Sequence, residues 1–349
     1  MYRIDNSTAS TVLPTPKPVG AGGFFTAGTI GGQAATIVEA DWLNQVQEEL
    51  MAILAADGMA PAKGTNNQVI TAILDIIAKN TRKRLTGPLT LYVDAASGYD
   101  TNNGLTPATA FATIQAAWNY IAESLDCGGY TITISIAHGT YPSLICSGQP
   151  LGLGQVQLLG DPVNPTAVVI QSATANVPAL EAVGAAAVYL SGLNFSTTGN
   201  QFSYAIAAYN GSLAYINGPV NFGACTAPHL VSVNGARIII DHSYTINGGA
   251  PTHYDASGTG SIATLGIPSS NIVVTLSGTP TFSTSFAQAD TNGMIEFVVS
   301  AMSFVGGAHG PRYAASMGGM IYVAGGGANY FPGDVAGATD ATTYGAYQG

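Results

Sequence analysis

The hydrophobic and polar positions of the chain follow one short pattern that recurs from about Gly184 to Phe331. Each copy starts beside a turn residue, alternates apolar with polar residues and closes on a large apolar residue. The closing residues lie at positions 195, 222, 246, 282, 304 and 331, so the steps are 27, 24, 36, 22 and 27 residues. A period in the twenties indicates repeats that bury their apolar faces only by stacking. The pattern predicts a right-handed parallel β-helix, with one coil enlarged by about ten residues around Gly258–Ser269.

Asn-Gly pairs mark the turns of this pattern. They begin at Asn210, Asn234 and Asn292, each just before an alternating apolar run. Asparagine and glycine tolerate the positive φ angles of tight turns. We therefore expect a turn at each pair.

The N-terminal part has a different pattern. Residues 1–35 are rich in Thr, Pro, Gly and Ala without a period, which predicts an extended arm that is ordered only where it docks. The adjacent Phe24 and Phe25 are either an anchor of this arm or part of a loop bend. Two amphipathic helices follow, with apolar stripes made of Leu43, Val46, Leu50 and Ile53 in the first and Ile70, Ile73 and Ile77 in the second. Each stripe needs a partner. Packing within the chain remains an alternative, but the narrow, short stripes favour an oligomeric bundle.

Between the helices and the coils, the pattern predicts a strand, a polar loop, a helix and a second strand. The strands are expected at 90–94 and 131–137, and the helix at 111–123, with Ile114, Ala117, Trp118 and Ile121 on one face. A β-helix leaves unpaired strand edges at the end of its stack. We expect this segment to cover that end.

Composition excludes several classes of protein. A hydrophobic content of 47% argues against disorder of the main body. Residues 85–349 contain only Arg237 and Arg312 against twelve acids, which argues against nucleic acid as a partner. The sequence contains neither an apolar run long enough to span a membrane nor an N-terminal export signal. Three cysteines are too few for a disulfide framework and fit folding in a reducing cytoplasm.

Residues 20–80 resemble the N-terminal region of tail-fibre proteins of bacteriophages and prophages. The resemblance rests on Gly22–Gly28, on Ala35–Leu50 and on Asn66–Ile73, and the run from Thr36 to Leu50 is its most specific part. In that family this end attaches the fibre to the tail or baseplate. The resemblance therefore implies a tail-attachment region, for which we select Phe24, Phe25 and Trp42.

Residues 89–331 resemble pectate-lyase-like β-helix proteins, a group that includes phage tailspikes. At the N-terminal end of the β-helix, this second resemblance rests on Tyr92–Asp94, Gly98–Leu105, Ala110–Ala117 and Gly139–Tyr141. It is specific for the fold and not for an activity, because the group includes lyases, hydrolases and non-catalytic members. The segment after the last coil, from Gly325 to Tyr347, resembles the end of phage β-helix proteins. We expect it to form a strand across the exit of the stack or one exchanged between subunits.

The resemblance implies two kinds of catalytic site. Tailspikes that depolymerise polysaccharide use carboxylate pairs about 5–5.5 Å or 6.5–9.5 Å apart. The acids of the coils are Asp161, Glu181, Asp241, Asp255, Asp290 and Glu296, and the sequence does not pair them. Pectate lyases use clustered aspartates for Ca²⁺ and an arginine base, and the clustered aspartates are missing. The densest titratable group consists of Asp241, His242, His253 and Asp255, which are weak catalytic candidates.

The remaining histidines and the tyrosines do not indicate a catalytic or metal site. His138, His229 and His309 are isolated in the sequence and lack zinc-ligand spacing, so no metal site and no cofactor are predicted. Recurrent tyrosines at 189, 204, 209, 215, 244 and 254 are interpreted as core or subunit-contact residues, and stacking on sugar rings stays open.

The predicted protein is a structural phage tail fibre or tailspike. Its expected parts are an arm (1–35), an α-helical tail-attachment and oligomerisation region (36–88), an N-terminal β-helix cap (89–145), the parallel β-helix (146–331) and a C-terminal extension (332–349). We expect a homotrimer in the virion, made in the host cytoplasm, bound to tail or baseplate proteins and attaching to host-surface glycan without inserting into a membrane. One alternative is a polysaccharide depolymerase. The other is a baseplate adaptor for another receptor-binding protein.

Overall fold

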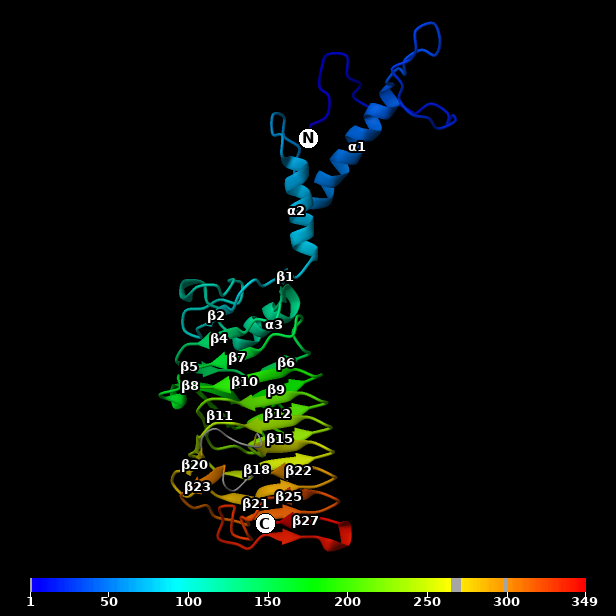
Figure 1. Ribbon diagram of the computed structural model, residues 1–349. Helices are drawn as coiled ribbons and strands as arrows, with labels where there is room; N and C mark the ends of the chain where they lie inside the picture. The colour runs from blue at the N-terminus through cyan, green and yellow to red at the C-terminus, as the bar shows by residue number, and fades with distance from the viewer. Residues whose placement is uncertain (1, 265–270, 298–300) are drawn as a thin grey trace. The chain divides into compact units, whose positions relative to one another are not determined.

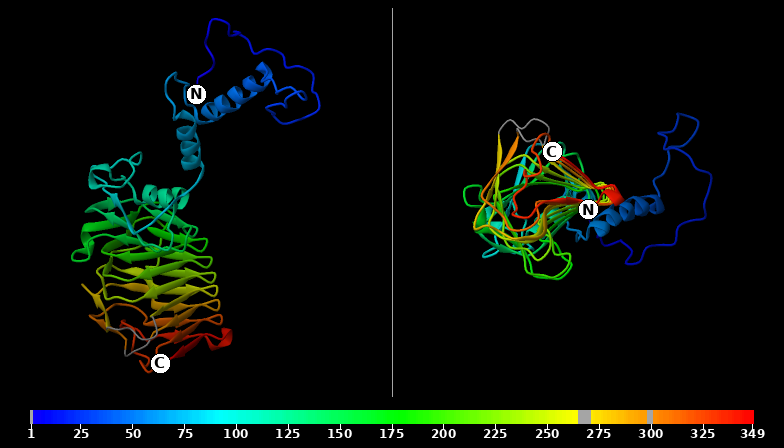
Figure 2. Two further views of the ribbon diagram at one scale, coloured as in Figure 1. Left: turned by 45° about the horizontal axis from the view of Figure 1, so that its top comes forward. Right: turned by 90° about the horizontal axis from the view of Figure 1, so that it is seen from below.

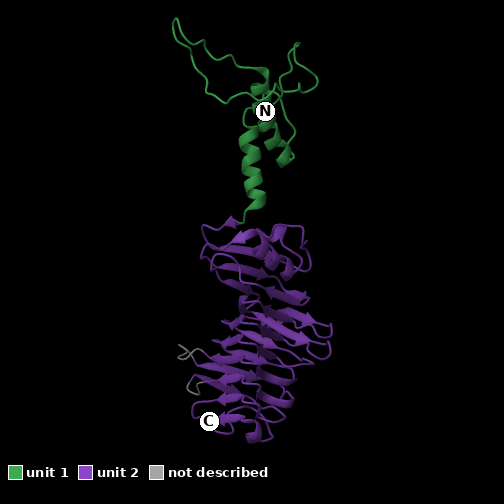
Figure 3. Ribbon diagram, turned by 90° about the vertical axis from the view of Figure 1, so that its right-hand side faces the viewer, with its two compact units in different colours: residues 1–82 green, residues 83–349 purple. Residues whose placement is uncertain are grey.

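The structure is a computed structural model that describes residues 2–264, 271–297 and 301–349. The chain divides into two compact units, residues 1–82 and 83–349 (Figure 3). The division lies a few residues before residue 89, where the sequence pattern placed the start of the β-helix cap.

Unit 1 consists of an arm and two helices. Residues 2–39 contain no helix or strand, and α1 (Ala40–Asp57) and α2 (Gln68–Asn80) follow. Gly58 ends α1 in the left-handed conformation, with φ of 81°. The helices are those that the apolar stripes predicted. Their mutual contact buries Leu54 and Ala72, and neither belongs to the predicted stripes.

Unit 2 is a parallel β-helix whose long strands form three sheets. Within the described ranges, the first sheet contains β2 (Leu89–Val93), β4 (Ile132–Ile136), β7 (Val156–Leu159), β10 (Ala187–Ser191), β13 (Leu213–Ile216), β16 (Arg237–Ile240), β19 (Ser261–Thr264), β22 (Met294–Glu296), β25 (Met320–Tyr322) and β27 (Ala346–Gln348). The second contains β5 (Gly139–Tyr141), β8 (Val168–Ser172), β11 (Leu193–Thr197), β14 (Val220–Phe222), β17 (Tyr244–Ile246), β20 (Ile272–Leu276) and β23 (Met302–Val305). The third contains β6 (Leu144–Ser147), β9 (Leu180–Val183), β12 (Ile206–Tyr209), β15 (Leu230–Val233), β18 (Ala250–Ser257), β21 (Phe282–Ala289), β24 (Tyr313–Ala315) and β26 (Ala338–Thr339).

Each coil passes through the three sheets in turn, and every coil pairs in parallel with the next (Figure 1). Viewed along the stack, the sheets surround a roughly triangular interior (Figure 2). The predicted fold class, a mainly β parallel β-helix preceded by an arm and a short helical region, is confirmed.

The core is built from in-register columns. Val188, Ala214, Ile238 and Ile262 are register partners in successive coils of the first sheet, and all are buried. Their neighbours along each strand alternate to the outside. Stacked apolar side chains of this kind contribute roughly 25 cal/mol per Å² of apolar surface that they remove from water. Each coil thus covers the core face of the previous one.

Three turn asparagines have the expected positive φ: 55° at Asn210, 57° at Asn234 and 61° at Asn292. Asn234 also donates a hydrogen bond to the side-chain oxygen of Asn210 in the coil before it, at 3.2 Å. This prediction is confirmed.

The predicted enlarged coil is wrong in its phase. The copies that close at residues 195, 222, 246 and 304 each consist of a strand of the first sheet followed by one of the second. The copy that closes at Phe282 instead consists of β20, in the second sheet, and the start of β21, in the third. The strand that the pattern missed is β19, which includes Ile262. Leu276, not Phe282, is the register partner of Ile246 and lies 30 residues after it. Val274 of the same strand pairs with Phe304, again 30 residues later. Part of the predicted insertion, residues 265–269, lies outside the described residues.

The N-terminal end of the stack is covered by α3 (Ile114–Ser124), as expected. Ile114, Ala117, Trp118 and Ile121 are buried. Thr113 caps the helix by accepting a hydrogen bond from the Ala116 N–H at 3.2 Å. Short elements complete this end: β1 (Lys83–Arg84), paired with β3 (Leu125–Asp126), and η1 (Pro107–Thr109). The first full coil, β4 to β6, already begins inside the predicted cap of residues 89–145, so the solenoid starts earlier than residue 146.

The C-terminal end continues the stack. β26 pairs with β24 and β27 with β25, both in parallel, around η3 (Ala341–Thr343); η2 (Pro165–Ala167) belongs to an earlier coil. The rings of Tyr313 and Tyr347 stack with centroids 3.8 Å apart. The predicted extension therefore adds strands to the solenoid.

Candidate functional site

The four weak catalytic candidates do not form one group. Asp241 follows β16 and accepts a hydrogen bond from the Tyr215 hydroxyl at 2.9 Å, and the exposed His242 follows it. His253 lies in the core, and Asp255 lies on the outer side of β18. The expectation of one titratable patch is wrong, because β16 and β18 belong to different sheets, with β17 between them, and because side chains alternate between the two faces of β18.

His253 belongs to a buried polar chain that the sequence did not predict. Its Nδ1 is 2.9 Å from Nδ1 of His229, and its Nε2 is 2.8 Å from the Tyr244 hydroxyl, which also contacts the Tyr254 hydroxyl. Nε2 of His229 lies 2.9 Å from the Gly223 carbonyl oxygen, so it donates. Nδ1 of His229 then accepts from Nδ1 of His253, and Nε2 of His253 accepts from Tyr244.

Both histidines of this hydrogen-bonded cluster are neutral. Burial lowers the pKa of His229 to about 4 and the pKa of His253 well below its usual value. Phe222, Phe282 and Phe286 surround the imidazoles. The cluster has no solvent-facing side, so its role is packing and satisfaction of buried polar groups.

Asp255 forms the most perturbed acidic site on the outer surface of the solenoid. Burial, and then the charge of Asp290, raise its pKa to about 7. The register partner of Asp255 is Gln288, and Asp290 lies two residues further along. Strand spacing and rise then put the Cα atoms of the two aspartates roughly 8 Å apart. Asp255 therefore lies in a strand and has a carboxylate neighbour, a pairing that the sequence did not predict.

Two tyrosines stand beside this acid. Burial, and then the charge of Asp255, raise the pKa of Tyr204 to about 12, and burial raises the pKa of Tyr209 further. Both phenols stay neutral at physiological pH and can donate hydrogen bonds. Glu181 lies on the same outer face, and burial raises its pKa. The arrangement is an outer face of the third sheet with one readily protonated carboxyl group, one carboxylate neighbour and two phenols.

The other recurrent tyrosines divide between core and surface. Tyr244 and Tyr254 are core residues. Tyr189 and Tyr215 stack on the outside of the first sheet, with ring centroids 5.1 Å apart.

The histidines that looked isolated in the sequence all have partners. His138 Nε2 lies 2.9 Å from Asp161, and His309 Nδ1 lies 2.6 Å from Asp334. These pairs join successive coils, which spacing along the chain could not reveal. Within residues 2–264, 271–297 and 301–349, no three His, Cys, Asp or Glu side chains gather in a way that could hold a metal ion. Cys127, Cys146 and Cys225 are buried free thiols.

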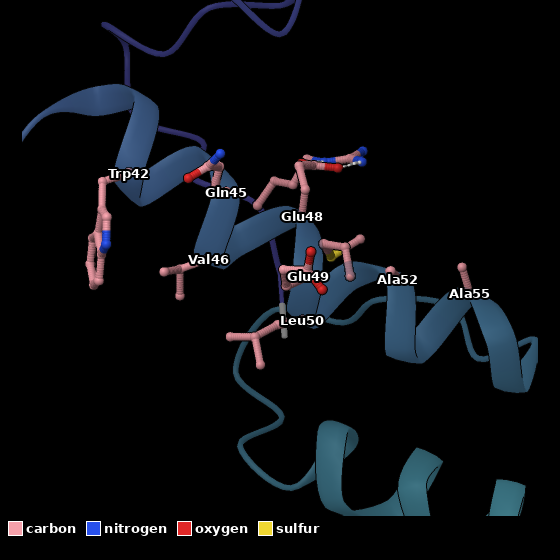
Figure 4. Close-up of a pocket in the computed structure, with 10 residues that line it drawn as sticks. Trp42, Gln45, Val46, Glu48, Glu49, Leu50, Ala52 and Ala55 are labelled. Atoms are coloured by element: carbon pink, nitrogen blue, oxygen red, sulfur yellow. Dashed lines mark hydrogen bonds and ion pairs between the residues drawn. The ribbon is translucent and has the colours of Figure 1, made fainter. Parts of the chain in front are cut away.

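The predicted oligomerisation stripes lie largely at the surface of unit 1. Leu43 is 53% exposed, Ile70 54% and Ile77 51%, while Val46 and Ile73 are also exposed and Leu50 and Ile53 are half-buried. An open groove of about 890 Å³ runs along α1 and is lined by residues that include Trp42, Val46 and Leu50 (Figure 4). Unit 1 thus leaves unpaired the apolar faces that amphipathic helices normally bury.

The predicted attachment residues share one end of α1. The rings of Phe25 and Trp42 meet edge to face with centroids 5.1 Å apart, so the arm docks on the helix there. Phe24 is 98% exposed. No described helix has both the length and the apolar composition needed to cross a bilayer.

Comparison of the sequence with protein families and with curated proteins finds no match. Comparison of the fold finds pectin methylesterase from carrot, with a TM-score of 0.33 and 13% sequence identity, covering 74% of this chain and 90% of that chain. Similarity at this level carries no argument about activity.

Proposed function

We propose that this chain is a structural tail-fibre or tailspike protein of a phage or prophage. Unit 1 mounts it on tail or baseplate proteins and assembles it as a homotrimer, and the solenoid of unit 2 faces the host surface. The observation that carries the proposal is the exposed apolar stripe of α1 and α2 in unit 1, whereas the solenoid of unit 2 covers its own core. The resemblance of residues 20–80 to tail-fibre N-termini supports the mounting role.

Association follows from the energetics of the stripe. Full burial of a Leu or Ile side chain contributes about 1.5–3 kcal/mol, so each of these half-exposed residues adds roughly half of that, and one chain offers several. Three copies meeting along such narrow stripes form a bundle of the kind that heptad-like spacing favours. The proposal places the chain in the virion after synthesis in the host cytoplasm.

The test is the location of the chain. Tail-bearing particles from the strain that encodes it are purified, labelled with gold-conjugated antibodies against the solenoid and imaged by electron microscopy. Labels on the tail or baseplate support the proposal. Intact particles that lack the chain by labelling and by mass spectrometry contradict it.

A polysaccharide depolymerase is the second candidate, favoured by the pair of Asp255 and Asp290. A carboxyl group with a pKa of about 7 is protonated enough at neutral pH to act as a general acid. A neighbouring carboxylate can then act as nucleophile or base, since the estimated backbone spacing allows either separation of about 5–5.5 Å or 6.5–9.5 Å.

The enzymatic test measures reducing ends released from host capsule or lipopolysaccharide. Asp255→Asn and Asp290→Asn each remove the activity if the pair is catalytic, and Asp241→Asn, on another face, is the matched control. No release by the parent protein leaves the attachment role. The baseplate-adaptor alternative instead predicts a protein partner on the solenoid and no glycan binding.

A further inference from the structure

A pocket opens near the C-terminal end of the solenoid, where the second sheet stops. Within the described residues β23 is the last strand of that sheet, while the other two sheets continue to β26 and β27. The segment that follows β23 lines a pocket of about 430 Å³, whose lining includes Thr279, Gly306, His309, Arg312, Asn329 and Asp334. Three successive coils contribute these residues.

His309 and Asp334 form an oriented pair in this pocket. Nδ1 of His309 lies 2.6 Å from Oδ2 of Asp334, and the Gly310 N–H donates to Oδ1 at 2.8 Å. The histidine, and then the Gly310 N–H, lower the pKa of Asp334. A carboxylate at Nδ1 places the imidazole proton there. Nε2 of the neutral ring is then a free acceptor, because it makes no hydrogen bond within the described part of the chain.

Arg312 gives the pocket a positive charge. One of its Nη1–H groups donates to the Val335 carbonyl oxygen at 3.2 Å, and its stem passes Gly333, where a Cβ would lie 3.1 Å from Cγ. Arg312 has no acidic ion-pair partner among the residues that the structure describes. The other arginine of residues 85–349 is Arg237, at the exposed start of β16.

We propose that this pocket binds a carboxylated sugar residue, with the carboxylate on Arg312 and a ring hydroxyl donating to Nε2 of His309. The guanidinium has several N–H groups left after its bond to Val335, and its planar fork matches a carboxylate. Asp334 orients His309 and does not contact the sugar. The volume suits one or two sugar residues.

Charge favours a carboxylate over a phosphate. One arginine neutralises one negative charge, and the chain around it carries a net charge of −10. A phosphate monoester, which bears about −1.5 to −2 at neutral pH, would leave charge uncompensated beside Asp334. A neutral sugar would leave the guanidinium without its counter-charge.

The test uses the full-length protein and small sugars, so it does not depend on attachment to a virion or on Asp255. Binding of glucuronate, galacturonate and mannuronate is measured by calorimetry and saturation-transfer NMR, beside glucose, galactose, mannose and glucose 6-phosphate. At least one uronate should bind about tenfold or more tightly than its neutral parent. Failure of all three uronates, or tighter binding of glucose 6-phosphate, overturns the proposal.

Variants locate the binding. Arg312→Gln should weaken the uronate about tenfold or more, and the matched Arg237→Gln should not change it. His309→Asn keeps a donor toward Asp334 and removes the acceptor at the Nε2 position, whereas His309→Gln keeps a polar group there. The first should lose more affinity than the second. Unchanged melting temperatures show that each variant is folded, and equal losses in Arg312→Gln and Arg237→Gln would contradict the site.

Discussion

Unit 2 buries its apolar side chains within one chain, whereas unit 1 leaves many of them exposed. In unit 2 the next coil covers almost every inward apolar residue, as in the column through Ile238 and Ile262. In unit 1 the contact between α1 and α2 buries Leu54 and Ala72 and leaves Leu43 and Ile77 exposed. A repeat supplies its own partner surface, whereas two short helices cannot. Unit 2 should therefore be stable as one chain, and unit 1 should depend on other copies.

The largest expected effect comes from removing a core ring of unit 2. Phe222→Ala deletes a buried ring that contacts Phe195 and Tyr244, which should lower the free energy of unfolding of the solenoid by about 3–5 kcal/mol. Urea unfolding measures it. The matched Phe202→Ala, at an exposed position, should change it by less than about 0.5 kcal/mol. Equal losses would contradict a self-sufficient core.

Acid pH should lower the free energy of unfolding of unit 2, because its two buried histidines are neutral in the folded state. The folded pKa values of His229 and His253 lie below the unfolded value of about 6.5, so unfolding takes up protons at acid pH. The stability of the neutral pair is complete above pH 6.5 and is lost as the pH falls toward 4. The slope is about 1.4 kcal/mol per pH unit for each histidine.

Unfolding measured from pH 7.5 to 4.5 checks this slope. His242→Gln is the matched variant, because it replaces an exposed histidine outside the core. A stability that is independent of pH in this window would show that the imidazoles are not buried neutral.

Asp255 should make unit 2 less stable as the pH rises, which is opposite to the effect of the histidines. Its folded pKa of about 7 lies above the unfolded value of about 3.9, so the fold bears no ionisation cost below pH 4 and a rising cost up to pH 7. Asp255→Asn removes that cost. We expect a gain of about 2 kcal/mol at pH 8 and little change at pH 4, after discounting for the partial access of water. A uniform change at both pH values would contradict the raised pKa.

The smallest effect concerns the arm of unit 1. Phe25→Ala removes the edge-to-face contact with Trp42, worth about 0.5–1.5 kcal/mol, and should speed proteolysis of the arm severalfold. Phe24→Ala is the matched control, because Phe24 has no ring partner within the described residues. Equal proteolysis rates in the two variants would show that the arm does not dock there.

The sequence pattern was sufficient for the fold and insufficient for the site. Alternation, period and Asn-Gly turns predicted the parallel β-helix, because successive coils repeat the same local pattern of apolar, polar and turn residues. The missed strand β19 shows the limit: Ile262 sits in a run of small residues whose alternation is weak. A single phase error shifted the predicted enlargement.

The sites depend on which coils become neighbours. Asp255 meets Asp290, and His309 meets Asp334, only after stacking brings residues about one coil apart together. The bulge between Ala250 and Thr252 shifts the register of β18 against β21, and spacing along the chain does not predict it. His253, two residues before Asp255, looked like its partner and lies in the core instead.

The most direct test of the contrast between the units is sedimentation equilibrium of the full chain beside the double variant Val46→Asp, Ile73→Asp. The parent protein should have a mass of about three times 35.4 kDa, and the variant should be a monomer whose solenoid melts at the parent temperature. A monomeric parent, or a variant that remains trimeric, would contradict the claim that the helical stripes hold the copies together.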